Sequence, residues 1–162
     1  MSMTWSRSIE CARSYSRVFG NVAPVPTVLL ATDADWIRDE VDSALGDELT
    51  TVTVVQAGAQ VIGAVAELKP DLVVLDLQIG NMGGMACCMA LRLEESGGRL
   101  PHVPVLMLLD RAADVFLAQR SGAEGWLIKP LDSFRLRRAA NALLAGGRFV
   151  EGIPSESVAE AL

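Results

Sequence analysis

The stretch DLVVLDLQIGNMGGM (residues 71–85) decides how this sequence folds. It joins an apolar run ending on Asp76 to a glycine-rich segment that contains no proline and no further acid. The run LVVLD (72–76) shows no polar alternation, which is typical of a strand covered on both faces. We therefore expect residues 72–76 at the centre of a parallel sheet, with Asp76 at the carboxyl end of its strand.

Short aliphatic runs alternate with longer amphipathic segments on both sides of this stretch. The predicted strands are 28–32, 51–55, 72–76, 104–109 and 125–129, and the predicted helices are 34–45, 58–68, 84–95, 112–121 and 132–145. This alternation predicts an α/β fold, a doubly wound five-stranded parallel sheet with flanking helices. We divide the chain into an N-terminal extension (1–26), one α/β domain (27–145) and a C-terminal tail (146–162).

The charge distribution argues against a nucleic-acid partner. Residues 1–26 contain Arg7, Arg13 and Arg17 against Glu10, and the rest of the chain holds 11 basic and 19 acidic residues. The main domain is therefore acidic, and an acidic surface repels phosphate backbones. We expect no binding of nucleic acid.

The cysteines and the hydropathy indicate a cytoplasmic protein. Cys11, Cys87 and Cys88 are odd in number and have no C-x-x-C spacing, and His102 is the single histidine, so we expect reduced thiols. No run of about 18 apolar residues exists that could span a membrane, and no signal peptide is recognisable. We expect neither export nor a membrane span.

Four residues lie at the carboxyl ends of predicted strands or directly after them, where the chemistry of open α/β sheets is found. They are Asp33, Asp76, Leu109 and Lys129. The motifs DLVVLD with a loop and GM, then PVLMLL, then GAEGWLIKP follow one another in this order. Over about residues 27–145 the sequence resembles the CheY-like receiver domain of two-component response regulators. The resemblance implies a flavodoxin-like fold with strand order 2-1-3-4-5.

In that family an aspartate accepts a phosphoryl group, an acidic pair holds Mg²⁺ and a lysine contacts the phosphoryl oxygens. The resemblance implies Asp76 as phosphoacceptor, Lys129 as the phosphate-contacting lysine, and Asp33 with Asp76 as ligands of a Mg²⁺ cofactor. Thr32 replaces the first acid of the pair, and a hydroxyl is a poorer ligand, so we expect weakened metal binding unless Asp35 or water fills the gap. Leu109 replaces the Ser or Thr of the family. The hydroxyl switch is therefore absent, and we expect the leucine to crowd the phosphoryl position.

A plainer explanation exists for some of these residues. Asp33 and Asp76 could be ordinary polar strand ends beside helix N-termini, where carboxylates are favoured. Their occurrence together with Lys129 favours an inherited site, although not a retained activity. Trp126 stands where receivers often carry a signalling aromatic, but packing in a half-buried edge strand explains it equally well, and the sequence does not separate the two.

One predicted helix is apolar on every side. The segment GMACCMALRL (84–93) leaves Met89 and Leu93 facing outward, and helix 112–121 adds Phe116. A helix that is apolar all round is normally covered by another surface. We expect a protein partner over Met89, Leu93 and Phe116. The alternative is that small Cys and Ala residues are merely neutral.

Residues 4–19 (TWSRSIECARSYSRVF) form a basic, amphipathic stretch. Such a stretch is typical of a docking arm that binds a partner or an anionic lipid surface, giving peripheral association with a membrane. A disordered extension is the alternative.

We interpret the chain as a stand-alone, atypical receiver, a pseudo-receiver that binds protein without an efficient phosphorylation switch and is not an enzyme. Because the tail after Gly147 is short, we expect no DNA-binding output domain in it. The alternative is a working phosphoacceptor, modified at Asp76 by a histidine kinase in a phosphorelay. An unrelated enzyme is disfavoured, because no G-x-G-x-x-G or Walker loop follows the first strand and no nucleophile with a paired histidine can be assembled from His102 alone.

The whole chain also resembles the orphan response-regulator-like proteins of mycobacteria and related actinobacteria. That resemblance implies an accessory role on respiratory complex I, the proton-pumping NADH dehydrogenase, at the cytoplasmic face of the inner membrane. A histidine kinase is the other partner that the family implies.

Overall fold

The computed structural model describes residues 24–152, so the predicted docking arm (4–19) lies outside the described residues. The strands are β1 (Thr27–Ala31), β2 (Thr51–Val55), β3 (Leu72–Asp76), β4 (Val105–Leu109) and β5 (Gly125–Ile128). The α-helices are α2 (Asp35–Leu45), α3 (Val61–Leu68), α4 (Gly84–Ser96), α5 (Val115–Ser121) and α6 (Ser133–Leu144). Single 3₁₀ turns at Gly58–Gln60 and Ala112–Asp114 precede α3 and α5. The five predicted βα units are confirmed.

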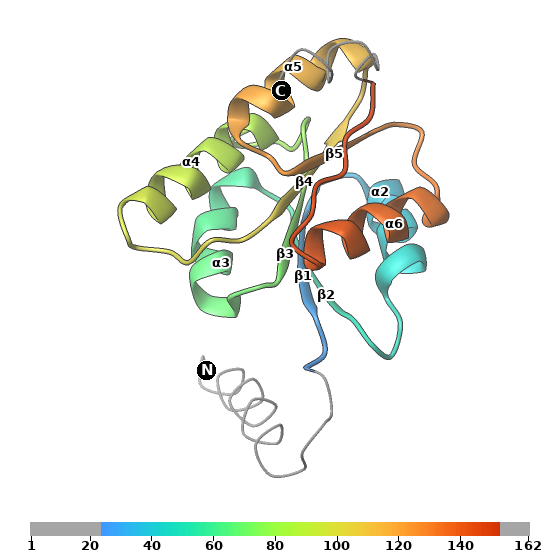
Figure 1. Cartoon of the computed structure of the whole chain (residues 1–162), viewed down its shortest axis with the longest axis horizontal. Coiled ribbons are helices and arrows are strands. Elements are labelled where there is room, and N and C mark those ends of the chain that lie inside the picture. The colour runs from blue at the N-terminus through green and yellow to red at the C-terminus, as the bar shows by residue number, and fades with distance from the viewer. Residues whose placement is uncertain (1–23, 153–162) are drawn as a thin grey trace.

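All strand pairs are parallel, and the sheet order is β2-β1-β3-β4-β5, as the resemblance implied. Every residue of β3 is buried, which confirms its predicted central position. Helices α2 and α6 cover one face of the sheet, and α3, α4 and α5 cover the other (Figure 1). The fold is therefore the doubly wound α/β fold that the sequence predicts.

Two apolar clusters hold these layers together, one on each face of the sheet. In β3, Leu72 and Val74 pack towards α2 and α6, whereas Val73 and Leu75 pack towards α3, α4 and α5. Because successive side chains of a strand point to opposite faces, one apolar strand serves both clusters. The same parallel arrangement brings the carboxyl ends of β1, β3, β4 and β5 to one edge of the sheet.

The glycine-rich loop after β3 is fixed to the turn that begins at Gly58. The Gly58 and Ala59 amides donate to the carbonyl oxygens of Gly80 (3.0 Å) and Asn81 (2.9 Å). A Cβ at Gly58 would lie 1.7 Å from the Met82 carbonyl oxygen, so only glycine permits this approach. The loop that leaves Asp76 thus has a defined path.

The chain after α6 returns along β5 and covers its outer edge. The Trp126 amide donates to the Phe149 carbonyl (2.9 Å), and its ring N–H donates to the Glu151 carbonyl (2.7 Å). The Glu151 carboxylate accepts from the Ile128 amide (3.1 Å) and from the Arg135 guanidinium. Trp126 lies in an edge strand as predicted, but it is only 1% exposed and not half-buried, because this returning segment covers the edge.

Candidate functional site

Asp76 and Lys129 form an ion pair at the carboxyl edge of the sheet. Lys129 Nζ donates to Asp76 Oδ1 over 2.9 Å, and the two side chains are only 10% and 3% exposed. The Gln78 amide also donates to Asp76 Oδ1, over 3.2 Å. The ends of β3 and β5, distant in sequence, thus place the predicted acceptor and the predicted lysine in direct contact.

Thr32 binds the other oxygen of the Asp76 carboxylate. Its hydroxyl donates to Asp76 Oδ2 over 3.0 Å and accepts from the Ala34 amide over 3.1 Å. Asp33 is exposed and accepts from the Gly80 amide through Oδ2 over 3.1 Å. Thr32 therefore turns inward to Asp76, whereas Asp33 fastens the loop that follows β3.

Asp110 is a member of the site that the sequence reasoning missed. It is the first residue after β4, and its Oδ1 accepts from Lys129 Nζ over 3.0 Å. The Lys129 ammonium is thus shared by Asp76 and Asp110. Trp36, at the start of α2, lies beside the same ammonium, with 5.6 Å between Nζ and the ring centre.

Leu109 and Trp126 lie in the core on the side of α3, α4 and α5. Leu109 is fully buried and belongs to the same apolar cluster as Trp126 and Met107. The leucine therefore supplies no hydrogen-bond donor to the acceptor edge, and its side chain is part of the packing. Trp126 likewise is a packed residue whose ring N–H is satisfied by Glu151.

The residues around Asp76 fit a Mg²⁺ ion poorly. Mg²⁺ prefers anionic oxygen ligands. Here Asp76 already accepts from Thr32 and Lys129, and Asp33 accepts from a backbone amide. Between residues 24 and 152, no cluster of three His, Cys, Asp or Glu side chains is arranged to hold a metal. Receivers generally use Mg²⁺, but the three carboxylates at this edge, Asp33, Asp76 and Asp110, each already accept a hydrogen bond.

The cysteines of α4 do not supply a reactive nucleophile. Burial raises the pKa of the Cys87 thiol and of the Cys88 thiol, although hydrogen bonds oppose the shift in both. Both thiols are buried and contact backbone oxygens, Cys87 at Gly58 and Cys88 at Ser121. A protonated, buried thiol is a poor nucleophile.

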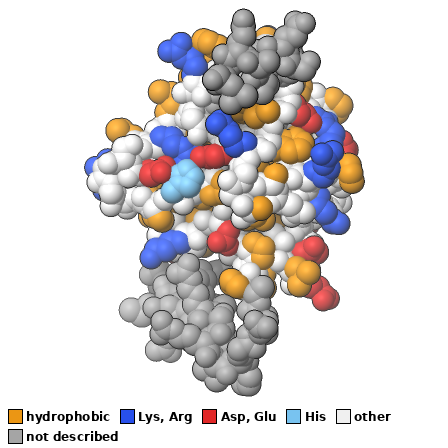
Figure 2. Space-filling view, viewed as in Figure 1, with side chains coloured by type: hydrophobic (Ala, Val, Ile, Leu, Met, Phe, Trp, Pro, Cys, Tyr) orange, Lys and Arg blue, Asp and Glu red, His pale blue; other side chains and the backbone are white. Residues whose placement is uncertain are grey.

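The predicted partner surface is solvent-exposed in the described structure. Met89, Leu93 and Phe116 are 50%, 65% and 58% exposed. Arg120 lies over the Phe116 ring at 5.3 Å from its centre. In the view of Figure 2, apolar side chains are interspersed with charged ones over the surface.

A charged network ties α4 to the segments before β4 and β5. Arg92 bonds Glu95 and Glu124 (3.1 and 2.6 Å), and His102 contacts the same two carboxylates (2.7 and 3.3 Å). Figure 2 shows the histidine between acidic side chains with a basic one nearby. This network supports the outer half of the sheet and lies away from Asp76.

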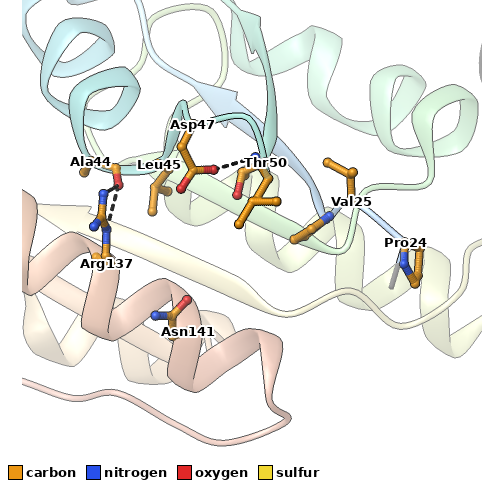
Figure 3. Close-up of a pocket in the computed structure, with 10 residues that line it drawn as sticks. Pro24, Val25, Ala44, Leu45, Asp47, Thr50, Arg137 and Asn141 are labelled. Atoms are coloured by element: carbon orange, nitrogen blue, oxygen red, sulfur yellow. Dashed lines mark hydrogen bonds between the residues drawn. The ribbon is translucent and has the colours of Figure 1, made fainter. Parts of the chain in front are cut away.

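A shallow groove opens at the opposite end of the sheet from Asp76. It lies between α2, α6 and the residues that directly precede β1 and β2, and Arg137 there donates to the Ala44 carbonyl (3.1 and 3.0 Å) (Figure 3). None of the predicted site residues lines this groove.

Between residues 24 and 152, no helix is long and apolar enough to cross a membrane.

Comparison with known proteins gives one family. Residues 28–141 match the response regulator receiver domain. The DNA-binding response regulator MtrA of Mycolicibacterium smegmatis is 33% identical over 105 residues, which cover 64% of this chain and 43% of the relative. The transcriptional regulatory protein AfsQ1 of Streptomyces coelicolor is 28% identical over 125 residues, which cover 76% of this chain and 53% of the relative. The chain spans about half the length of these curated relatives.

Solved structures show the same fold. The signal receiver domain of NarL from Mycobacterium tuberculosis superposes with a TM-score of 0.66 at 26% identity, covering 75% of this chain and 97% of that one. The BeF3-activated receiver domain of RstA from Klebsiella pneumoniae gives a TM-score of 0.63 at 25% identity, covering 73% of this chain and 97% of that one.

Proposed function

The chain belongs to the response regulator receiver domain family, and we propose that it is an atypical receiver that binds a protein partner without an efficient phosphorylation switch. One observation carries the proposal. The Lys129 ammonium, which a phosphoryl group would need, is already bonded to both Asp76 and Asp110. In this proposal the protein is a binding module and not an enzyme.

The chemistry of the acceptor supports slow phosphorylation. A carboxylate attacks phosphorus through an oxygen lone pair, and hydrogen bonds to that oxygen lower its nucleophilicity. Asp76 Oδ1 accepts from Lys129 and Gln78, and Oδ2 accepts from Thr32. Whichever oxygen attacks, it does so with its electron density reduced by the donors that it accepts from. With Thr32 in place of an acid, less negative charge is available to hold the metal that would neutralise the phosphoryl group.

A second candidate is a working phosphoacceptor in two-component signalling. The comparisons favour it, because the curated relatives are named as response regulators and transcriptional regulators. The direct contact between Asp76 and Lys129 also suits it. In this candidate a histidine kinase is the partner, Mg²⁺ is the cofactor, and Asp76 carries the phosphoryl group.

Phosphorylation by a small donor separates the two candidates. Wild type and Asp76→Asn are incubated with acetyl phosphate and Mg²⁺, and intact mass is recorded over time. We expect little wild-type phosphoprotein after an hour at millimolar donor. Stoichiometric phosphorylation of wild type, absent in Asp76→Asn, would replace the first candidate with the second.

The exposed apolar side chains of α4 and α5 are the proposed binding surface. Leu93 is 65% exposed on α4, and Leu49, 71% exposed before β2, is a matched control far from this surface. A pull-down with wild type, Leu93→Glu and Leu49→Glu tests the surface. We expect Leu93→Glu alone to lose the partner, and equal recovery by both variants would contradict the assignment.

The partner class follows from resemblance and family. A subunit of respiratory complex I, which would place the protein at the cytoplasmic face of the inner membrane, is the first choice, and a histidine kinase is the second. Mass spectrometry of the same pull-down distinguishes them. Recovery of a histidine kinase without any respiratory subunit would remove the complex I proposal.

A further inference from the structure

We propose that Asp110 is a built-in counter-anion of the acceptor site, occupying the Lys129 ammonium that a phosphoryl group would otherwise contact. The inference rests on the proposed function and deepens it, since it names the group that keeps the switch from responding. It assigns a positioning role to a residue that the strand-end pattern did not single out.

The strand register explains why Asp110 meets Lys129. In the β4–β5 ladder, Leu109 pairs with Ile128, so the next residues, Asp110 and Lys129, leave the two strands side by side. The Lys129 amide donates to the Leu109 carbonyl over 2.8 Å, which extends this pairing to the last residue. The contact between the two side chains is therefore set by the backbone.

The segment after Asp110 is also fixed. The Arg111 amide donates to Asp114 Oδ2 over 3.1 Å, and the Arg111 guanidinium contacts the same carboxylate. Asp114 itself is 5% exposed. Asp110 thus stands between an anchored strand end and an anchored turn, which limits how far its carboxylate can withdraw from Lys129.

The burial of Lys129 and the charge of Asp110 explain why their contact affects anion binding at Asp76. The Lys129 side chain is 10% exposed, whereas the Asp110 side chain is 35% exposed. A nearly buried ammonium needs an anionic partner, and here two carboxylates share it. Two of the three N–H donors of Lys129 are engaged by Asp76 and Asp110, so an incoming phosphoryl oxygen shares the ammonium charge with Asp110, and the Asp110 carboxylate adds its own negative charge beside the incoming anion. Both effects weaken binding of an anion at Asp76.

Beryllofluoride with Mg²⁺ is the probe, because it mimics a phosphoryl group on aspartate. Trp36 fluorescence reports binding, since its ring lies 5.6 Å from Lys129 Nζ, and Trp36→Phe serves as the blank. The titration compares wild type with Asp110→Asn and Asp110→Glu. Asp39→Asn is the control, because it removes the same charge from an exposed position on α2.

We expect Asp110→Asn to bind beryllofluoride about tenfold or more tightly than wild type, as release of one charge-assisted hydrogen bond predicts. Asp110→Glu keeps the competing charge and should bind like wild type, as should Asp39→Asn. A merely structural role of Asp110 would not give this pattern. Thermal unfolding of each variant shows that it is folded.

The outcomes separate this inference from the proposed function. If wild type and Asp110→Asn both bind weakly and alike, the inference is overturned and the proposed function stands. If wild type binds tightly and Asp110→Asn no more so, both are overturned. If wild type binds tightly and Asp110→Asn still about tenfold more tightly, the inference stands and the proposed function falls.

Discussion

The substitution Thr32→Asp tests whether the missing acid limits metal binding. The Thr32 hydroxyl lies 3.0 Å from Asp76 Oδ2, and Thr32 is 2% exposed. An aspartate there would face Asp76 with a second carboxylate. At this 3.0 Å separation and an effective dielectric constant of about 20, two unit charges repel by about 5.5 kcal/mol. The Lys129 ammonium offsets part of this repulsion. We therefore expect Thr32→Asp to lower the free energy of unfolding at neutral pH by about 2–4 kcal/mol without metal.

Mg²⁺ should reverse this loss, because a cation between two carboxylates replaces repulsion by attraction. A ligand that binds only the folded state adds about 2.7 kcal/mol at a hundred times its Kd. The assay is urea unfolding followed by circular dichroism, with and without Mg²⁺. The neutral isostere Thr32→Asn is the control. We expect a large Mg²⁺ shift for Thr32→Asp and little shift for wild type or Thr32→Asn.

Two results would refute this reasoning. If Thr32→Asp and Thr32→Asn unfold at the same urea concentration in metal-free buffer, the predicted repulsion with Asp76 does not exist. If Mg²⁺ leaves the Thr32→Asp midpoint unchanged, position 32 is not what limits metal binding, and the cause lies with the engagement of Asp33 and Asp76 in other hydrogen bonds.

Three further predictions concern the core and the returning segment. Glu151→Gln should lower the free energy of unfolding by about 1–2 kcal/mol and speed hydrogen exchange at the Ile128 amide, and unchanged exchange there would contradict the role of Glu151. Leu109→Thr places a hydroxyl in a fully buried apolar site and should cost about 2–4 kcal/mol in urea unfolding, so a cost below about 1 kcal/mol would show that the site tolerates it. In a Cys11→Ser background, Cys87 and Cys88 should react with a disulfide reagent at pH 8 more slowly in the folded than in the unfolded protein, because burial shields both thiols and raises their pKa; equal rates would refute this.

The raised pKa of the Cys88 thiol also determines the direction in which the free energy of unfolding changes with pH. Because the folded pKa of the Cys88 thiol is raised above the ordinary value of 9.0, the neutral thiol favours the folded state. This contribution is fully present below that value and is lost as pH rises through the folded pKa. Comparison of urea midpoints for wild type and Cys88→Ala between neutral and alkaline pH measures it, and the two midpoints should converge as pH rises.

Much of the fold could be predicted because local patterns and global layers agree. The run 72–76 lacks polar alternation, and it is the central strand. The apolar spacing of Ile37, Val41 and Leu45 gives a helix whose buried side packs on the sheet. The same reasoning brought Asp76 and Lys129 to one edge, because parallel strands share an edge for their carboxyl ends.

Two features escaped prediction because they depend on contacts between distant segments. Asp110 lies one residue beyond the end of β4, and only the register with β5 shows that it reaches Lys129. Attention to the residue after each strand, as well as its last one, would have found it. Glu151 lies 23 residues after Ile128 and covers the edge of β5. No periodicity in the tail predicts that contact.

The retention of Asp76 and Lys129 is by itself no evidence that the chain is phosphorylated. Asp76 is buried and the Lys129 side chain is only 10% exposed, and removal of one partner from a buried ion pair commonly costs about 3–5 kcal/mol. Between residues 24 and 152 no buried side-chain nitrogen or oxygen lacks a hydrogen-bond partner, and Thr32 and Asp110 provide the bonds that complete this site. A receiver that no longer turned over phosphate would therefore still lose stability on losing either residue. Stability alone explains why both remain, so the evidence for activity has to come from the behaviour of Asp76 toward a phosphoryl donor.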